Sequence, residues 1–369
     1  MKKVNRVVYL TIIWITFSCE PLVTTFNDVE NAILYEANNF KTESAPEGNI
    51  RVMTWNIRFG IGRLPFFGDS CGDRSVFTED EVLNALELLA AEIDAIDPDI
   101  ILLQEVDRES KRTQYIDQVQ WLLNHTDMNY AAYASMWKAQ VIPSDGIGRI
   151  DAGNVVMSKW EIEEAERIQL PLRTDQDALT QMFYLRRNVL KTKIDIPGQN
   201  NFYAVNIHAT AFATDDTKQR HIDKFREILD EIDEAGNTFV AGGDFNSVPP
   251  DVDSLDFCIE DMCDGESFHN PGDNPEHKEG SYFNNFVNEP SILKPLYDSY
   301  NSAIIEDTAT DSAHYTHSTS LDRALDRKLD YIFFSQSLET ASGTTHQDVI
   351  EDEQLSDHAP VSVTISLEQ

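Results

Sequence analysis

Six short apolar segments, each with a polar residue at one end, constrain the fold of this chain most strongly. The polar residue follows the first four runs and precedes the last two; the runs span 50–55, 100–104, 202–207, 238–243, 331–334 and 361–365. Short runs rich in Val, Ile and aromatic residues, bounded by turn residues, are typical of buried strands. If all six polar ends meet at one edge, the last two strands must run opposite to the first four. The sequence therefore predicts mixed β-sheets rather than an all-parallel sheet.

Two amphipathic helices are predicted between these strands. Apolar residues recur at helical spacing over 81–96, where Pro98 ends the pattern, and again over 216–232. The chain has 369 residues, of which 41% are hydrophobic, so it can bury a large core. Strands and helices alternate without a repeated unit. We therefore expect one α/β domain over residues 49–369, with packed sheets inside and helices outside.

The charge of the chain limits its partners. It carries 64 acidic and 29 basic residues, for a formal net charge of −35. A field of this sign repels nucleic acids and anionic lipid headgroups at long range, so we expect no tight nucleic-acid binding. Hydrolysis of a phosphate ester stays compatible with this charge, because one bound divalent cation reverses the potential inside a cleft. Nothing in the sequence identifies an obligate protein partner.

The start of the chain is predicted to be a targeting signal over residues 1–18. Three basic residues precede the apolar run 7–15, which is shorter than the roughly 20 residues that a membrane-spanning helix needs. Cys19 comes directly after the predicted signal 1–18, as at the lipidation site of a bacterial lipoprotein. Lipidation of Cys19 is the main prediction, with ordinary signal cleavage and an uncleaved anchor as alternatives. We expect an exported protein at the cell envelope or outer surface, held by a lipid anchor. Residues 19–48 would be its lipidated N-terminus and a tether with a short helix-prone piece.

The other three cysteines are Cys71, Cys258 and Cys263. An oxidising compartment would allow Cys258 and Cys263 to pair, although spacing alone does not fix the connectivity. A zinc site at these cysteines is less expected, because their spacing to histidines matches no standard pattern.

The polar residues at the strand ends share a chemistry rich in carboxylate and amide oxygens and free of thiolates. They are Asn56, Glu105, Asp244, Asn246, Asp357 and His358. Such donors suit Mg²⁺, Mn²⁺ or Ca²⁺ better than zinc. A single carboxylate after an apolar run is ordinarily a turn residue or helix cap, and a single histidine such as His208 is ordinarily structural. Six runs flanked in this way instead indicate a metal-assisted site.

Ordered motifs at these positions resemble those of the endonuclease/exonuclease/phosphatase superfamily, which includes DNase I, AP endonucleases, neutral sphingomyelinases and inositol polyphosphate 5-phosphatases. They read TWNIR (54–58), LQEV (103–106), NIH (206–208), GGDFN (242–246), KLDYIF (328–333) and LSDHAPV (355–361). Residues 152–158 also resemble the Gly-Asn strand of this family. The resemblance covers about residues 49–367. It implies a DNase I-like α/β fold: a four-layer α-β-β-α sandwich of two mixed β-sheets.

The resemblance also implies a metal site that holds Mg²⁺ or Mn²⁺, with Ca²⁺ as a further candidate. Glu105 is the principal expected ligand. Asn56 and Asp357 are expected nearby, as ligands or as groups that orient them. The cation would polarise a phosphoryl oxygen and offset the charge that develops in an in-line displacement.

Catalytic roles follow from the same resemblance. Asp244 would orient and deprotonate the attacking water, or hold a second metal, and Asn246 would donate a hydrogen bond to phosphate. Asp330 would pair with His358 and favour its imidazolium form, which can protonate or bind a phosphate oxygen. His208 would supply a second imidazole. Substrate contacts are expected from Asn154 and Arg58.

Two positions depart from the AP endonuclease pattern. Arg58 stands where those enzymes carry an acidic ligand, and His208 stands where they carry Tyr, so abasic-site repair is disfavoured. Arg58 either contacts substrate phosphate or is a solvated loop residue. The pair Arg186–Arg187 and the segment 312–317 either line the cleft or belong to surface loops.

Two functions remain at this point. The first is an exported metal-dependent phosphoesterase that hydrolyses a phosphodiester or a phosphomonoester by in-line attack of an activated water. The alternative is a catalytically silent surface-binding lipoprotein on the same fold. The complete set of motif residues favours the enzyme. The lack of an aromatic and basic stripe favours a small or lipid-derived phosphate ester over a nucleic-acid strand.

Overall fold

The computed structural model describes residues 24–42, 44–68, 72–142, 146–211, 213, 215–252, 257, 289–319, 324–340, 343–351 and 353–367. The predicted signal at 1–18 lies outside these residues, as do Cys19, Cys71, Cys258 and Cys263. Lipidation and disulfide pairing therefore stay predictions. Among the described helices, none is both long enough and apolar enough to cross a bilayer.

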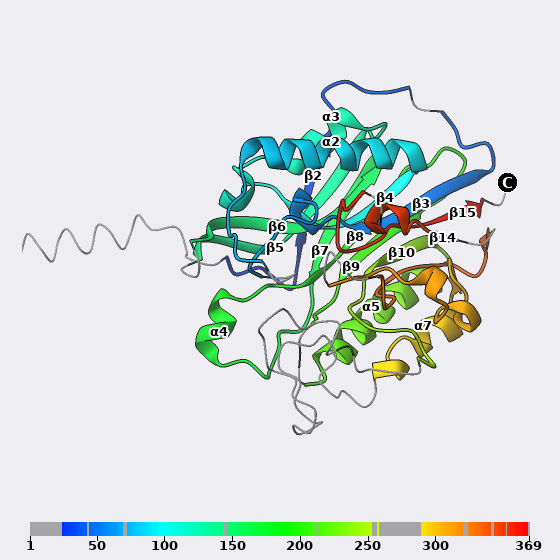
Figure 1. Ribbon diagram of the computed structural model, residues 1–369. Coiled ribbons are helices and arrows are strands. Elements are labelled where there is room, and N and C mark those ends of the chain that lie inside the picture. Colours follow the sequence, from blue (N-terminus) through cyan, green and yellow to red (C-terminus); the bar gives the residue numbers. More distant parts are fainter. Residues whose placement is uncertain are drawn as a thin grey trace, which may run out of the picture.

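Two mixed β-sheets form the centre of the described structure (Figure 1). The eight-stranded sheet contains β2 (Ile33–Glu36), β3 (Asn49–Asn56), β4 (Ile100–Asp107), β5 (Tyr130–Ile142), β6 (Gly148–Ser158), β13 (Glu339–Thr340), β14 (Thr344–Thr345) and β15 (Val361–Ser366). The seven-stranded sheet contains β1 (Val29–Asn31), β7 (Ile162–Gln169), β8 (Asn188–Ile194), β9 (Phe202–His208), β10 (Thr238–Asp244), β11 (Asn301–Ser302) and β12 (Asp330–Phe334).

The strand directions confirm the predicted mixed sheets. The pairs β3–β4 and β9–β10 are parallel, whereas β15 runs antiparallel to β3 and β12 runs antiparallel to β10. The carboxyl ends of the first four predicted strands and the amino ends of the last two therefore lie at the same end of the sandwich. This arrangement brings their polar residues together.

Helices cover the outer face of each sheet. Figure 1 shows α2 (Glu79–Ile96) and α3 (Gln118–His125) over the eight-stranded sheet, and α5 (Thr217–Glu234) and α7 (Lys294–Ser299) over the other. The shorter helices are α4 (Ala178–Phe183), α8 (Asp348–Glu351) and the 3₁₀ turns η1 (Arg58–Gly60), η2 (Lys111–Thr113), η3 (Glu289–Ser291), η4 (Glu306–Thr308) and η5 (Ser312–His314). The four-layer α-β-β-α sandwich is confirmed.

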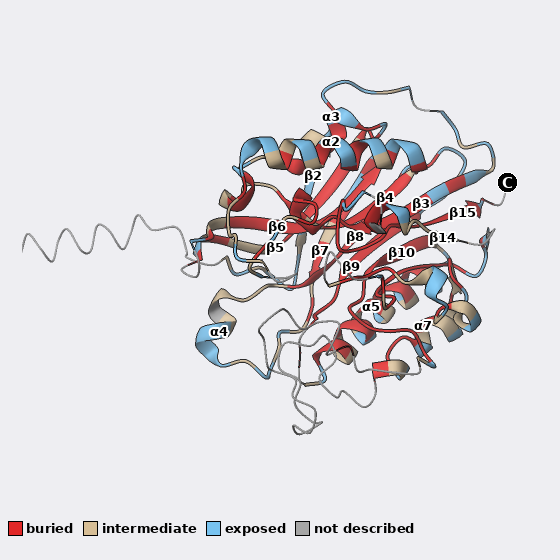
Figure 2. Cartoon of the chain, in the orientation of Figure 1, coloured by how far each residue is buried: buried red, intermediate tan, exposed pale blue. Residues whose placement is uncertain are grey.

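The two predicted helices extend slightly beyond their apolar stripes. Helix α2 begins at Glu79 because Thr78 caps it: the Thr78 side chain accepts a hydrogen bond from the backbone of Glu81, whose side chain accepts one from the backbone of Thr78. The buried face of α2 packs on β3 and β4, and that of α5 packs on β9 and β10. Figure 2 shows buried residues along the strands and exposed residues on the outer surface of α2.

A buried amide pair connects the two sheets within the largely apolar interior between them. Nε2 of Gln104 on β4 donates to Oδ1 of Asn206 on β9 at 2.7 Å. Nδ2 of Asn206 donates to the carbonyls of Leu103 and Val155, at 2.7 and 2.8 Å. These hydrogen bonds connect the sheets next to two predicted site residues, since Glu105 directly follows Gln104 and His208 comes two residues after Asn206.

Residues 29–36 form two edge strands. The prediction of a helix-prone piece in the tether is therefore wrong for these residues. Strand β1 pairs with β7 of one sheet and β2 pairs with β5 of the other, with only Ala32 between them. Hydrogen bonding to two open sheet edges decides this conformation, which local sequence preference does not reveal. The folded part of the chain therefore begins before residue 49.

Candidate active site

The strand ends place the predicted site residues at one end of the sandwich. Asn56 ends β3, His208 ends β9 and Asp244 ends β10. In the register of the seven-stranded sheet, Asp244 lies opposite His208 on one side and Asp330 on the other. His358 comes three residues before β15.

Glycines allow the close strand approach around Asp244. An ideal Cβ on Gly243, whose φ is 142°, would lie 1.9 Å from the carbonyl oxygen of Ile207. A Cβ on Gly242 would lie 2.4 Å from the carbonyl oxygen of Tyr331. The Gly-Gly pair of the GGDFN motif therefore permits β10 to fit between β9 and β12.

Left-handed backbone positions present several of the site side chains. Glu105 has φ 56°, Asn246 has φ 48° and Arg58 has φ 46°. Glu105 also lies where the β4–β6 pairing shifts register, between Leu103 and Val106. Such irregularities redirect side chains, and they occur often at functional sites. The Glu105 side chain is 19% exposed, compared with 2% for that of His208.

Asp244 is the centre of the hydrogen-bond network. Its Oδ2 accepts from Nδ2 of Asn56 at 3.2 Å and from Nδ2 of Asn246 at 3.1 Å, and its Oδ1 accepts from the Asn246 backbone at 2.9 Å. Nε2 of His208 lies 3.3 Å and Nε2 of His358 lies 3.8 Å from Oδ2. Burial raises the pKa of Asp244 to about 6, against the opposing charge of His358. A carboxylate of this pKa can accept a proton from water near neutral pH.

His358 is held as a cation by buried carboxylates. Its Nδ1 donates to Oδ2 of Asp330 at 2.8 Å. Burial alone would lower the pKa of His358, but Asp330 and Asp244 outweigh it and raise the pKa to about 10. Nε1 of Trp55 donates to the His358 carbonyl at 2.7 Å, and Oγ of Ser356 accepts from its backbone N–H at 3.2 Å. The imidazolium is thus fixed by its backbone as well as by its ring.

His208 has the opposite electrostatic character. Its Nε2 lies 3.3 Å from Oδ2 of Asp244 and 3.9 Å from Oε1 of Glu105. Burial and the charge of Arg187 hold the pKa of His208 well below its ordinary value. The site therefore combines one neutral and one cationic imidazole. Arg187, which the sequence placed either in the cleft or on the surface, is 8% exposed, and its charge acts on this site.

Arg58 is fully buried, so its interpretation as a solvated loop residue is wrong. Its Nε lies 3.5 Å from Oδ2 of Asp357, and its Nη1 donates to the carbonyl of Leu64 at 3.0 Å. Burial would raise the pKa of Asp357, but the charges of His358, Arg58 and Arg63 outweigh it and lower this pKa. Arg58 therefore holds Asp357 ionised. A contact between Arg58 and substrate stays a prediction.

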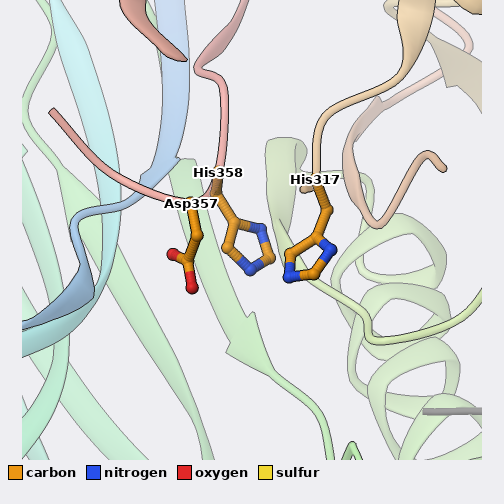
Figure 3. Close-up of side chains that lie close together, drawn as sticks. All are labelled: His317, Asp357 and His358. Atoms are coloured by element: carbon orange, nitrogen blue, oxygen red, sulfur yellow. The ribbon is translucent and has the colours of Figure 1, made fainter. Parts of the chain in front are cut away.

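His317 belongs to the segment 312–317, which was expected either to line the cleft or to form a surface loop. Its ring lies edge-on to that of His358, with 4.7 Å between ring centroids, and Figure 3 shows the His358 ring between the His317 ring and the Asp357 carboxylate. His317 is 1% exposed. Burial and the charge of His358 lower the pKa of His317 well below its ordinary value. The only signal in the sequence was its membership in the segment 312–317, which carries no strand or helix pattern.

The sequence pattern of the endonuclease/exonuclease/phosphatase family matches residues 53–358. The chain belongs to this family. No protein with a curated description matches the chain.

Solved structures of other proteins share the fold. A family protein from Beutenbergia cavernae has a TM-score of 0.55 and 20% identity, and the match covers 87% of this chain and 72% of that one. A family protein from Bacteroides vulgatus has a TM-score of 0.52 and 15% identity, and the match covers 87% of this chain and 99% of that one. The mannosyl-6-phosphatase of Bacteroides thetaiotaomicron has a TM-score of 0.50 and 13% identity, with 86% and 100% covered. At these identities the comparison establishes the fold alone.

Members of the endonuclease/exonuclease/phosphatase family typically depend on a divalent metal, and the donor chemistry here fits one. Asn56 and Glu105 come from neighbouring strands, since Asn56 pairs in register with Gln104. Together with Asp357 they offer two carboxylates and one amide oxygen, the donors that hard cations prefer. Two further groups have ligand atoms within 4.8 Å of one another: Asp244, Asp330 and His358, and His317, Asp357 and His358.

Asn154 on β6 contacts Asn188 on β8 of the other sheet. It is fully buried on β6, and its Nδ2 donates to the Asn188 carbonyl at 3.1 Å. Its Oδ1 has no hydrogen-bond partner among the described residues. The substrate-binding role of Asn154 stays a prediction.

Proposed function

We propose that this protein is a divalent-metal-dependent phosphoesterase that hydrolyses a phosphomonoester or phosphodiester by in-line attack of water. One observation carries the proposal: Nε2 of His358 lies 3.8 Å from Oδ2 of Asp244, a carboxylate whose pKa burial raises to about 6. A base and an acid held side by side match the two proton transfers of ester hydrolysis.

The residues around Asp244 have the following roles in the proposed reaction. Asp244 accepts the proton of the attacking water, and the side-chain amides of Asn246 and Asn56 hold Oδ2 of Asp244 in position through their hydrogen bonds. Nε2 of His358 donates to a phosphoryl oxygen or to the leaving group. Neutral His208 supplies a second imidazole beside Asp244. Mg²⁺ or Mn²⁺ held by Glu105, Asn56 and Asp357 would polarise a phosphoryl oxygen and offset its developing charge.

The substrate proposed is a small or lipid-derived phosphate ester. The net charge of −35 disfavours long-range attraction of nucleic acid. The similarity to a protein called mannosyl-6-phosphatase adds sugar phosphates to the candidates, at 13% identity. We expect weak, salt-sensitive cleavage of DNA at most.

The first test uses the full chain with bis-p-nitrophenyl phosphate and p-nitrophenyl phosphate, in the presence of Mg²⁺ or Mn²⁺. We expect turnover that EDTA and Glu105→Gln both abolish. Glu109→Gln, which alters an exposed carboxylate four residues away, is the matched control and should keep full activity. Turnover that survives both EDTA and Glu105→Gln would contradict metal dependence. Absence of turnover with either ester would support the silent binding lipoprotein instead.

The second test sorts the substrates. Sphingomyelin, inositol phosphates, mannose 6-phosphate, nucleotides and plasmid DNA are compared side by side at one salt concentration. We expect kcat/KM for one of the small or lipid-derived esters to exceed that for DNA. Nanomolar affinity for duplex DNA at physiological salt would contradict this choice of substrate class.

We further propose that the protein is exported and lipid-anchored at Cys19. Support comes from the basic residues and apolar run of residues 1–18. Metabolic labelling with an alkyne fatty acid should mark the full chain but not Cys19→Ala, and fractionation should place the labelled protein in the envelope. Equal labelling of both forms would contradict the assignment of Cys19.

A further inference from the structure

We propose that His317, Asp357 and His358 form a second metal site, which binds Zn²⁺ or a similar transition-metal ion and inhibits hydrolysis by occupying the catalytic imidazole. Zinc binding stands on the geometry alone. The inhibition rests on the proposed function.

The three side chains are close enough to bind one ion together. One ligand atom of each lies within 4.8 Å of those of the other two. His317, Asp357 and His358 are 1%, 5% and 3% exposed. Figure 3 shows the two imidazole rings and the carboxylate next to one another, on two separate segments of the chain. A small displacement of the side chains would bring all three to coordination distance.

Backbone hydrogen bonds hold the two segments in register. The backbone N–H of Ala359 donates to the Thr316 carbonyl at 2.7 Å, and that of Ser318 donates to the Asp357 carbonyl at 3.1 Å. These bonds flank the pairing of His317 with His358. The ligands therefore belong to one preorganised unit rather than to two independent loops, which reduces the entropy lost when an ion binds.

His358 has the hydrogen bond that orients many metal-bound histidines. Its Nδ1 donates to the Asp330 carboxylate at 2.8 Å, which directs Nε2 toward an ion and increases its basicity. The carboxylates of Asp330, at Nδ1, and Asp244, near Nε2, also supply negative charge around the ring. They oppose the charges of Arg58 and Arg63, which disfavour a cation near Asp357.

The donor set distinguishes this site from the predicted magnesium site. Two imidazoles and one carboxylate suit Zn²⁺, whereas Asn56, Glu105 and Asp357 offer oxygens only. Zinc on Nε2 of His358 displaces the proton of that atom to solvent. The enzyme then lacks the imidazolium of His358 as its acid. Asp357 binds zinc in place of Mg²⁺, so hydrolysis stops while zinc is bound.

Binding is tested first, without substrate, on the metal-free full chain. Co²⁺ serves as the probe, because four-coordinate Co²⁺ gives intense visible absorption that Zn²⁺ abolishes when it displaces the ion. We expect such bands for the wild type and at least about tenfold weaker binding of Co²⁺ and Zn²⁺ for His317→Gln. His314→Gln, on the same segment but outside the cluster, is the matched control and should bind like the wild type. Equal binding by wild type and His317→Gln overturns the site.

A second measurement covers the case in which His317→Gln fails to fold. X-ray absorption spectroscopy of zinc bound to the wild type and to His208→Gln should show two imidazole ligands in both. Fewer than two imidazoles in the wild type, or loss of one in His208→Gln, overturns the assignment to His317 and His358.

Inhibition is tested last, with bis-p-nitrophenyl phosphate and excess Mg²⁺. Zinc should inhibit the wild type and His314→Gln at concentrations that fill the site, and His317→Gln should need at least about tenfold more. Zinc binding without inhibition overturns the inhibitory role. A wild type that binds zinc but shows no turnover with Mg²⁺ contradicts the proposed hydrolase and leaves the zinc site supported.

Discussion

The hydrogen bond from Nδ1 of His358 to Oδ2 of Asp330, 2.8 Å long, joins the two β-sheets at the active site. His358 precedes β15 of the eight-stranded sheet, and Asp330 opens β12 of the seven-stranded sheet. Both residues are buried. The placement of one sheet on the other therefore decides whether the imidazole meets its carboxylate.

Replacement of this carboxylate should shift the pH dependence of hydrolysis. Asp330 is a principal cause of the raised pKa of His358, about 10, so Asp330→Asn should lower that pKa. The imidazolium is the active form below its pKa, and the variant should lose it at a lower pH than the wild type. We expect kcat/KM to fall about 10²–10⁴-fold, with an alkaline limb displaced to lower pH. Asp311→Asn, an exposed acidic residue, is the control, and an unmoved alkaline limb in Asp330→Asn would count against the pair.

A buried ion pair between α5 and η3 should contribute to stability only as a pair. Nζ of Lys218 lies 3.1 Å from Oε1 of Glu289, and the two residues are 2% and 0% exposed. Lys218→Met or Glu289→Leu alone leaves a buried charge without this partner, so we expect each to lower the free energy of unfolding by about 3–5 kcal/mol. Lys218→Met with Glu289→Leu should lose much less. Urea denaturation of the wild type, the two single variants and the double variant measures these free energies as a double-mutant cycle.

The control for that cycle is the exposed pair Lys224–Glu227, whose atoms lie 3.0 Å apart. Lys224→Met should change the free energy of unfolding by less than about 1 kcal/mol. Additive losses in the Lys218–Glu289 double variant would mean that the two residues act independently.

His221 should make the protein less stable in mild acid. Its Nδ1 accepts from the Thr210 backbone at 3.2 Å and its Nε2 donates to the Pro171 carbonyl at 2.8 Å, so the folded protein requires the neutral ring. Burial lowers its pKa from 6.5 to about 4. The unfolded chain therefore binds more protons between these values, and stability falls as pH decreases through this range.

We expect this effect to reach roughly 3 kcal/mol near pH 4. Gln at this position can make similar hydrogen bonds without titrating, so the stability of the wild type relative to His221→Gln should decrease by that amount from pH 7 to pH 4. Chemical denaturation at each pH measures it. A difference that is constant with pH would show that His221 is not the titrating group.

Gly243 should tolerate no side chain. A Cβ there would lie 1.9 Å from the Ile207 carbonyl oxygen, so Gly243→Ala must push β10 away from β9. We expect a loss of more than about 2 kcal/mol in the free energy of unfolding, together with loss of activity because Asp244 moves. Gly236→Ala is the control, because φ is 72° there and nothing lies within 4 Å of the added Cβ. It should cost only about 1 kcal/mol. Equal losses of stability in Gly243→Ala and Gly236→Ala would mean that backbone strain, rather than the steric clash with Ile207, causes the loss.

Much of the site was predictable because its residues end regular strands. Asp244 follows an apolar run whose pattern is unambiguous, and the parallel register then fixes it beside His208. His317 was not predictable in this way. It comes from an irregular loop, and its position beside His358 depends on a two-residue bridge between segments that no periodic pattern marks.

The predicted fold was incomplete for a related reason. Strands β5, β7 and β8 carry alternating or mixed burial, unlike the continuous apolar runs of β4 and β10. The short strands β1 and β2 expose most of their side chains, so their sequence gives no burial signal at all. Their structure comes from backbone hydrogen bonds to edges that only the assembled sheets provide.

The continuous path from β1 to β2 has a practical consequence for expression of this protein. A recombinant fragment that began at residue 49 would lack the partners of β7 and β5 and would present two bare strand edges to neighbouring molecules. Such edges recruit other chains and lead to aggregation. Because Ala32 alone separates the two pairings, this short segment also joins the edge of one sheet to the edge of the other.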